Sequence, residues 1–579
     1  MSKLLYVHNR LERVDTALTN RLSAICDALV PDNLTMAPQH TIRASGQTAF
    51  AVAMSNTLLT TTQMSVLLGC LYEPPDQGWE HPGTRNPDGN YVIVRAGKGV
   101  IEFLSDAAAT RTLWYYLDDA IFVASTSQRA IVMYLGSFVF DDRVLPWLLS
   151  TGTLGPELSW DARFKRLQAD SSLILDTDRW TISVTANPVA FTAAPAPVAQ
   201  HRERLRDAIS TTMRALSSLD LGSMVLPLSG GYDSRSILCF LDEDARTIEG
   251  FKAVTWGLEQ SLTEPGNDAK IAVELASVLG VKHEYHHTDV SDEPIEAIID
   301  RFIRCGEGRI DHLSGYMDGM EVWRHLHDTG VCAIIRGDEG FGSEAVSSEL
   351  TMKQFIAFGS CADYENLAGV IDAFGLPQQE VPEELARRPG ESLASWRDRL
   401  FLQYRLPTGF AALSDIKSSY VEPLNPLLSK TILRAVQSLP DHLRTEKKLF
   451  RTIVRDVSPE VPFATKGANA SPHDLLKSEA LVKLMKDKLS SDDAQRSLGT
   501  QFIDFIVGGI KDRQVNPNRR SIRSRILHWL KSVVPRGIRN LLSDTVLRPK
   551  VDGNELAFRV YIIVRMQELL RDDARLVKQ

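Results

Sequence analysis

The 579-residue sequence lacks the features that mark membrane, secreted and nucleic-acid-binding proteins. No window approaches the ~18 uninterrupted apolar residues of a membrane-spanning helix, and the apolar run after Met1 is too short for a signal peptide. The net charge of -8 leaves no excess of basic residues, so the chain is not built mainly to hold a phosphate backbone. These absences predict a cytoplasmic protein with no membrane span and no nucleic-acid partner.

Cysteine is also scarce, and its positions form no C-x-x-C pair. The six residues are Cys26, Cys70, Cys239, Cys305, Cys332 and Cys361. Most have apolar neighbours, which predicts buried, reduced thiols. The content of 44% hydrophobic and 24% charged residues is typical of globular proteins. A chain of this length is expected to form two or three domains.

The most informative stretch runs from Met224 to Ser236, where a short apolar segment precedes Ser229-Gly230-Gly231-Tyr232-Asp233-Ser234. The segment predicts a buried parallel strand, the glycines a tight turn, and Ser234 the first turn of a helix. Such a junction leaves backbone N–H groups unpaired at the positive end of the helix dipole, which predicts an anion site.

The chemistry of this turn favours a nucleotide. Gly230 and Gly231 let a phosphate approach the backbone, and Ser229 and Ser234 can donate hydroxyl hydrogen bonds. The turn has no Lys before a Ser or Thr, so it is not a Walker loop. Asp233 would repel phosphate unless a cation lay between them, so we infer a nucleotide held by its pyrophosphate portion with bound Mg²⁺. The alternative is a glycine-serine turn that only joins a strand to a helix.

A second apolar strand, Val331–Ile335, ends in Arg336 followed by Gly337, Asp338 and Glu339. Carboxylates at the end of a strand, opposite a phosphate loop, are suitable ligands for Mg²⁺ that bridges a pyrophosphate. The alternative is an ordinary acidic turn, but two such loops about a hundred residues apart are more specific than either alone.

The elements between these loops predict a doubly wound parallel sheet. Phe251–Trp256 is expected to be a strand, Asp268–Gly280 a helix with one apolar face, and His283–His287 another extended segment. In such a sheet, ligands bind beyond the carboxyl ends of the strands. The three histidines of the last segment alternate between two faces, so we expect a hydrogen-bonded or solvated edge there rather than a metal site.

The first part of the chain, residues 1–193, is expected to be rich in strands with some helices. Runs of β-branched and aromatic residues occur between turn residues. These runs are Ala49–Ala53, Tyr91–Val94, Val100–Leu104, Leu113–Leu117 and Ile121–Ala124.

The Ser-Gly-Gly-x-Asp-Ser turn resembles the pyrophosphate loop of N-type ATP pyrophosphatases. From about Asp88 to Gly467 the order of motifs resembles asparagine synthetases. The resemblance implies an α/β protein with a degenerate Ntn-type glutaminase-like α+β domain (1–193), an ATP-binding ligase domain with the doubly wound sheet (200–470) and a helical, partly basic C-terminal extension (471–579).

The resemblance also implies roles for individual residues and the cofactors ATP and Mg²⁺. Lys466 and Asp233 are the catalytic candidates, since a mobile cation at Lys466 would stabilise charge on the reacting phosphates. The metal candidates are Asp233, Asp338 and Glu339. The ATP-binding candidates are Ser229, Gly230, Gly231, Asp233, Ser234, Thr255, Trp256, Leu258 and Gly337, with Thr255, Trp256 and Leu258 beside adenine. For Lys466 the alternative is a solvated loop residue, and for the adenine candidates a strand end in the core.

The chain departs from the family at the glutaminase nucleophile, because Ser2 stands where the family has Cys and the first cysteine is Cys26. We therefore predict no glutamine hydrolysis. The departure shifts the resemblance toward lasso-peptide macrolactam synthetases and β-lactam synthetases. In β-lactam synthetases a Tyr–Glu pair deprotonates an internal amine; Tyr316 and Glu344 fall in that neighbourhood, although a structural role is the stronger expectation for each.

The predicted function is ATP-dependent amide-bond formation: a small-molecule or peptide carboxylate is activated as acyl-AMP, pyrophosphate leaves, and an amine attacks. The amide either closes a ring, as in a macrolactam, or joins two small molecules. One alternative is a catalytically idle homologue that acts as a binding or scaffold subunit. Another, a pyrophosphatase-type enzyme acting on tRNA or a nucleotide carbonyl, would need a basic face and often zinc-spaced cysteines, and the sequence shows neither.

The tail, residues 471–579, lies beyond the resemblance. Phe502–Ile510 and Ser521–Leu542 are expected to be helical, and the second is basic and amphipathic. We expect it to pack on its own domain with a solvated face. The alternative is peripheral binding to a membrane surface or an acidic partner.

Overall fold

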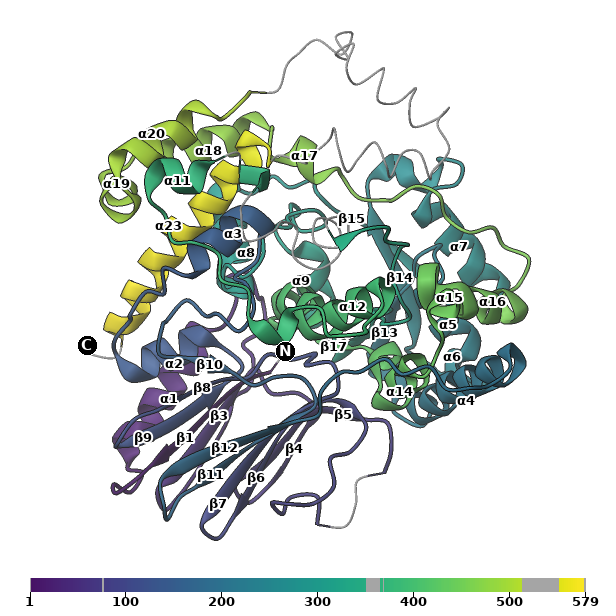
Figure 1. Cartoon of the computed structure of the whole chain (residues 1–579), viewed down its shortest axis with the longest axis horizontal. Helices are drawn as coiled ribbons and strands as arrows, with labels where there is room; N and C mark the ends of the chain where they lie inside the picture. The colour runs from purple at the N-terminus through teal and green to yellow at the C-terminus, as the bar shows by residue number, and fades with distance from the viewer. Residues whose placement is uncertain (1, 75–77, 350–364, 368, 513–550, 577–579) are drawn as a thin grey trace.

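The computed structural model describes residues 2–74, 78–349, 365–367, 369–512 and 551–576. Within these residues it contains two six-stranded sheets and one five-stranded sheet. Figure 1 shows the two larger sheets at the lower left and the smaller sheet, with its helices, to their right. Helices of the C-terminal region lie at the upper left of the same view.

The two six-stranded sheets are antiparallel and come from the first part of the chain. The first has the order β10 (Lys165–Arg166), β8 (Trp114–Leu117), β9 (Ile121–Ser125), β1 (Lys3–Asn9), β3 (Thr48–Ala53) and β2 (Thr41–Ser45). The second has the order β12 (Thr181–Ala186), β11 (Ser171–Asp176), β7 (Val100–Ser105), β6 (Gly89–Gly97), β5 (Ser65–Leu71) and β4 (Leu59–Thr62). The strands predicted from the sequence are confirmed.

Strand β1 shows why these sheets pack face to face. Leu4 and Tyr6 are buried in a cluster that contains residues of both sheets. Leu5 and Val7 point the other way, into the cluster that contains helices α1 (Thr16–Ala28) and α2 (Gln128–Leu135). Strand β1 carries apolar residues on both of its faces and is buried on both. Helices α1 and α2 cover the face of the first sheet that points away from the second sheet.

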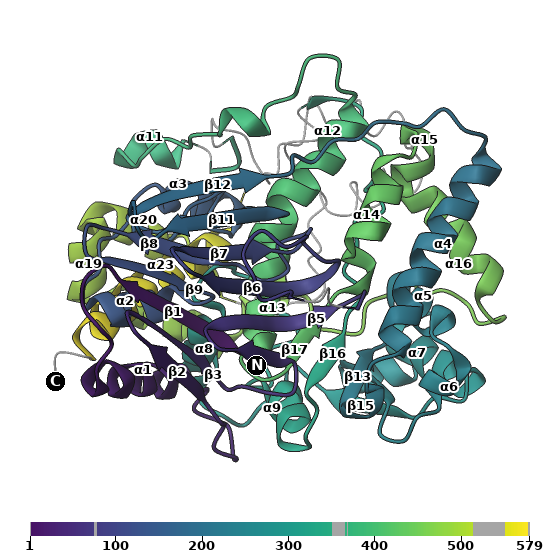
Figure 2. The same ribbon diagram turned by 90° about the horizontal axis from the view of Figure 1, so that it is seen from below.

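The five-stranded sheet is parallel throughout, which confirms the predicted parallel sheet. Its order is β15 (His283–His287), β14 (Lys252–Gly257), β13 (Met224–Pro227), β16 (Ala333–Ile335) and β17 (Glu422–Leu424). Leu226 and Val225 of β13 enter different hydrophobic clusters, so helices cover both faces. In Figure 2 the helices of one face gather at the right, beyond the antiparallel strands.

Helices on the two faces come from separate parts of the chain. One face is covered by α4 (Val198–Ser217), α5 (Asp233–Phe240), α7 (Asp268–Val278), α14 (Lys430–Gln437) and α16 (Lys448–Val457). The other is covered by α8 (Ile295–Gly306), α9 (Glu321–Asp328) and α13 (Ala411–Ser418). Shorter or peripheral helices are α3 (Val144–Thr151), α6 (Glu243–Arg246), α11 (Val370–Phe374), α12 (Leu393–Leu400), α15 (Asp441–Arg444) and α17 (Pro472–Leu475).

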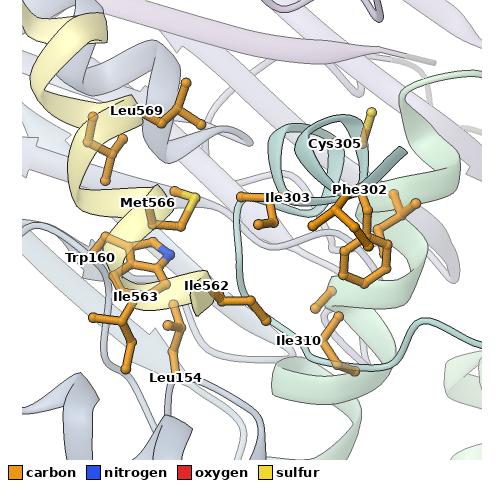
Figure 3. Close-up of a cluster of buried hydrophobic side chains, with 14 of the residues drawn as sticks. Leu154, Trp160, Phe302, Ile303, Cys305, Ile310, Ile562, Ile563, Met566 and Leu569 are labelled. Carbon is orange, nitrogen blue, oxygen red and sulfur yellow. The ribbon is translucent and has the colours of Figure 1, made fainter. Parts of the chain in front are cut away.

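The C-terminal region contributes α18 (Glu479–Leu489), α19 (Asp492–Leu498), α20 (Thr500–Gly508) and the long α23 (Gly553–Leu576). Most of the 24 residues of α23 are buried. Figure 3 shows Ile562 and Met566 of α23 beside Trp160 of the first part of the chain and near Ile303 of α8. One continuous core therefore joins the first domain, the parallel-sheet domain and the last helix.

A buried ion pair reinforces this junction. Arg129 of α2 donates two hydrogen bonds to Asp573 of α23, at 2.8 and 3.0 Å, and both side chains are almost fully buried. Burial alone would lower the pKa of Arg129, but the Asp573 carboxylate outweighs that effect and raises it. The last helix is thus held to the first domain by both apolar and charged contacts.

Two predictions about the tail have different outcomes. The expected helix at Phe502–Ile510 is confirmed as α20, which begins at Thr500. The basic segment Ser521–Leu542 lies outside the described residues. Among the helices that the structure does describe, none has both the length and the apolar content needed to span a bilayer. The five described cysteines are free thiols.

Candidate functional site

The predicted phosphate loop lies where β13 turns into α5. Helix α5 begins at Asp233, so its first backbone N–H groups have no acceptor within the helix. Neither Gly230 nor Gly231 has a positive φ, so the turn does not need glycine for its backbone angles. At position 230 glycine is needed because there is no room for a side chain: a Cβ there would lie 2.8 Å from Cγ2 of Ile271.

Hydrogen bonds already order this loop. The Ser234 hydroxyl accepts a hydrogen bond from the backbone N–H of Ser229 at 2.9 Å. The hydroxyls of Ser229 and Ser234 also form a hydrogen bond with each other, at 2.9 Å. The N–H of Gly230 donates to Asp268 of α7 at 2.8 Å, and burial raises the pKa of Asp268. Asp268 is a residue that sequence reasoning missed, because its role depends on α7 packing beside the loop. A phosphate at Gly230 would have to replace this carboxylate as acceptor.

The acidic turn lies directly against the phosphate loop, because β13 and β16 are neighbours in the sheet. A Cβ on Gly337 would lie 2.9 Å from the backbone nitrogen of Ser234 and 3.1 Å from the carbonyl carbon of Asp233. Only glycine fits at 337 without moving one of the two backbones. The structure therefore brings together the two loops that the sequence selected independently.

Lys447 bridges the two loops. Its ammonium lies 3.0 Å from both carboxylate oxygens of Asp233 and 2.8 Å from Oε1 of Glu339. Burial raises the pKa of Asp233 and of Glu339, the latter to about 7. Burial alone would lower the pKa of Lys447, but the two carboxylates outweigh it and raise that pKa.

The backbone at Lys447 is unusual as well. Glu446 and Lys447 have φ values of 58° and 56°, a left-handed conformation that L residues rarely adopt. Each such residue costs about 1–3 kcal/mol. Because Lys447 precedes the first residue of α16, this kink directs its side chain toward the two carboxylates. Sequence reasoning missed Lys447, since nothing in the pattern Glu446-Lys447-Lys448 distinguishes one lysine from the next.

The third predicted metal ligand, Asp338, has a different partner. Arg336 donates two hydrogen bonds to its carboxylate, at 3.0 and 2.9 Å. The donor set still fits a divalent cation, because Asp233 and Glu339 present oxygens from two adjoining loops to a single positive charge. The Lys447 ammonium stands between them where such a cation would bind.

A cavity of about 590 Å³ opens beside the two loops. Its walls include the predicted residues Ser229, Asp233, Ser234, Thr255, Trp256 and Gly337, together with Asp268, Ser314, Arg336 and residues 467–472. Leu258 does not line it and instead pairs through its backbone N–H with Ala468.

Thr255 and Trp256 are held in different ways. The Thr255 hydroxyl donates to the carbonyl of Leu228 at 2.7 Å and lies 2.8 Å from Nε2 of His283. The ring of Trp256 packs edge-on against Trp323 of α9, with centroids 4.9 Å apart. Thr255 is thus a buried residue in the wall of the cavity. Trp256 is half-buried and exposes part of its aromatic ring to the cavity.

Lys466 lies at the border of the cavity, but its side chain points elsewhere. Its ammonium donates to Oε1 of Glu264 at 2.5 Å, and about half of the side chain is exposed. The residues that follow it, beginning with Gly467, line the cavity. The structure therefore does not bring Lys466 together with Asp233 and Glu339, and its catalytic role stays a prediction.

The candidates for a base are also separated. Tyr316 is buried, and its hydroxyl accepts from the Lys417 ammonium at 2.6 Å. Burial lowers the pKa of Lys417 well below its ordinary value. Glu344 is exposed, and its backbone carbonyl accepts from Arg397. The Tyr–Glu pair is not formed, and the partner of Tyr316 is a lysine.

Ser2 occupies a closed environment. Its side chain is fully buried, and its backbone N–H donates to Glu422 of β17 at 2.8 Å. The start of the first domain is therefore anchored on an edge strand of the parallel sheet.

Comparison with known proteins finds one matching family and distant structural neighbours. The family model of asparagine synthase matches residues 200–338. The U34-tRNA thiolase NcsA from Methanococcus maripaludis, with its 4Fe-4S cluster, is 10% identical over 60% of this chain and 97% of that chain, with a TM-score of 0.21. The glutamine phosphoribosylpyrophosphate amidotransferase from B. subtilis, in complex with ADP and GMP, is 8% identical over 49% of this chain and 65% of that chain, with a TM-score of 0.19. No curated protein matches the chain.

Proposed function

We propose that the chain is an ATP-dependent ligase that forms an amide bond, on the basis of the match between residues 200–338 and the family model of asparagine synthase. A carboxylate oxygen of the substrate attacks the α-phosphorus of ATP, pyrophosphate leaves, and the resulting acyl-AMP is attacked by an amine. AMP is then the leaving group in place of hydroxide, which makes the carboxyl carbon reactive. The substrate is a small-molecule or peptide carboxylate, and we propose that the enzyme works in the cytoplasm without nucleic acid.

One observation carries this proposal: the phosphate loop and the acidic turn touch beside a cavity large enough for a nucleotide. Gly337 contacts the backbone of Asp233 and Ser234, and Lys447 joins Asp233 to Glu339. A phosphate chain laid along the start of α5 would meet the unpaired N–H groups and the positive end of that helix.

The roles of the side chains follow from their positions. Asp233 and Glu339 would hold Mg²⁺, which when bound neutralises the pyrophosphate as charge builds on it. Lys447 would then turn its ammonium from the carboxylates toward phosphate oxygens, where a cation stabilises the departing charge. Arg336 keeps Asp338 paired, and Trp256 offers its ring to adenine. Lys466 is proposed as a further cation that reaches the phosphates once it leaves Glu264.

The amine does not come from glutamine hydrolysis in this proposal. The first domain, proposed to be glutaminase-like in origin, presents a buried Ser2 whose backbone N–H is bonded to Glu422. The amine is therefore either free ammonia or an amine of the substrate itself, in which case the amide closes a ring such as a macrolactam.

A scaffold protein is the second candidate, and one feature favours it. Both carboxylates proposed for Mg²⁺, Asp233 and Glu339, are already paired with Lys447, and Asp338 beside them is paired with Arg336. A protein that has lost catalysis keeps such internal pairs at no functional cost, whereas an enzyme must break at least one of them to bind metal.

Pyrophosphate release separates the two candidates. The full-length protein is incubated with ATP, Mg²⁺, ammonia and a panel of carboxylic acids that includes peptides with Asp or Glu side chains and a free N-terminus. The ligase proposal predicts AMP and pyrophosphate in equal amounts and, by mass spectrometry, either a cyclised substrate that has lost one water or the amide that the substrate forms with ammonia. The Asp233→Asn variant should abolish all three. Absence of pyrophosphate with every acid, together with tight binding of the acid or peptide, would favour the scaffold.

A further inference from the structure

A cluster of metal-ligating side chains lies outside the nucleotide cavity, between the edge strand β15 and helix α9, both labelled in Figure 1. Glu284 and His286 are two residues apart on β15 and so share one face of the strand. His325 of α9 completes the group: its ring lies 5.2 Å from that of His286, and the two are inclined by 52°. One ligand atom from each of the three side chains lies within 4.8 Å of the other two.

We propose that Glu284, His286 and His325 form a binding site for a divalent transition metal of the zinc type. This departs from the edge without metal that the alternating histidines of β15 predict, because the third ligand, His325, comes from α9. Two imidazoles and one carboxylate are a ligand set that zinc takes in proteins, with the remaining position left to water. Ligand atoms on a tetrahedral zinc lie about 3.4 Å apart, given bonds of about 2.1 Å. Because no pair of ligand atoms is more than 4.8 Å apart, each pair needs to close by at most about 1.4 Å, which small rotations of side chains at a sheet edge can supply.

His286 is the residue most clearly prepared for a ligand. Its Nε2 is buried and makes no hydrogen bond to any residue that the structure describes. The nearest carboxylate oxygen, Oε2 of Glu284, is 3.8 Å away. A buried polar atom without a partner costs free energy, and a metal ion is the partner that would satisfy it together with the other two side chains.

Lys252 of β14 competes for the site. Its ammonium lies 2.7 Å from Oε2 of Glu284. A metal ion that binds Glu284 therefore has to displace the Lys252 ammonium from that carboxylate. This contact makes the proposal sharply testable, because removal of Lys252 should strengthen metal binding instead of weakening it.

A metal at this site would have a structural effect on the nucleotide cavity. Helix α9 carries both His325 and Trp323, and Trp323 packs against Trp256, which lines the nucleotide cavity. A metal that joins α9 to β15 would fix the helix behind this wall of the cavity. The inference stands on these side chains alone and does not depend on the proposed ligase activity.

The test is titration of the full-length protein, stripped with EDTA, with Zn²⁺ alone by calorimetry and with Co²⁺ alone by visible absorption. We expect one zinc equivalent that raises the apparent Tm. Affinity should fall at least about 10-fold in His286→Ala and in His325→Ala, stay unchanged in the control His287→Ala, and rise in Lys252→Met.

Three results would overturn the proposal: no saturable zinc binding, binding that survives in a His286→Ala/His325→Ala double variant, or no gain in Lys252→Met. The carboxylates of Asp233 and Glu339 can also attract zinc, so the titration is repeated in Glu339→Gln, where the expected equivalent must persist. Circular dichroism of each variant without metal confirms that it is folded.

Discussion

Replacing Lys447 by Met should have two opposite effects on this protein. The side chain keeps its length but loses the charge that joins Asp233 and Glu339, at 2.8 to 3.0 Å. Without nucleotide, the two carboxylates are left facing each other, so Mg²⁺ should bind the variant more tightly than the wild type. With ATP, the variant lacks a cation for the departing pyrophosphate, so turnover should fall.

The magnitudes follow from the burial of the three groups. Removing one partner of a fully buried ion pair costs about 3–5 kcal/mol, and an exposed pair contributes about 0–1 kcal/mol. The side chains of Lys447, Asp233 and Glu339 are 22%, 32% and 11% exposed, so we expect a loss of roughly 2 kcal/mol in the absence of metal. Loss of one group that stabilises developing charge lowers kcat by about 10²–10³.

The assay measures both effects on the same preparation. Thermal unfolding with and without Mg²⁺ reports metal binding, and pyrophosphate release with the best substrate of the panel reports turnover. Lys448→Met is the matched control, because Lys448 is the next residue and is exposed. Wild-type turnover in Lys447→Met, with no increase in the Mg²⁺-dependent shift of Tm, would refute the reasoning.

Three further predictions follow from single contacts. Gly337→Ala should lower ATP turnover at least about 10-fold, because the new Cβ would lie 2.9 Å from the backbone nitrogen of Ser234. The control Gly508→Ala, where a Cβ meets nothing within 4 Å, should leave pyrophosphate release unchanged, and equal rates in the two variants would contradict the prediction. Ser2→Ala should leave glutamate release from glutamine undetectable, as in the wild type, and glutamate release by the wild type that the variant loses would show a working glutaminase. Asp573→Asn should destabilise the docking of the last helix by about 3–5 kcal/mol, because it breaks the buried pair with Arg129; proteolysis of α23 at the wild-type rate would count against this.

Much of the parallel-sheet domain was predictable from local pattern. The run Met224–Pro227 is apolar because β13 lies in the middle of the sheet and is buried on both faces, so strand and turn could be read from a few residues. The two loops were found as separate motifs, and their contact follows from the rule that ligand loops sit at the carboxyl ends of parallel strands.

The parts that the sequence did not predict depend on contacts between distant segments. Lys447 and Asp268 reach the site only because α16 packs beside α5 and α7 begins beside the phosphate loop, and one lysine among many carries no local signal. Lys466 was selected by its place beside a glycine, yet its side chain pairs with Glu264. The burial of α23 was missed too, because a helix with apolar residues on most of its faces can be identified only after its partners are known.

The central claim is that the phosphate loop and the acidic turn together bind the phosphates of ATP. Hydrogen–deuterium exchange of the full-length protein, with and without ATP and Mg²⁺, tests this claim without knowledge of the substrate. We predict protection of peptides that contain residues 229–234 and 336–341, and loss of that protection in Gly337→Ala. Unchanged exchange in both peptides at saturating ATP, or protection confined to another part of the chain, would contradict the account.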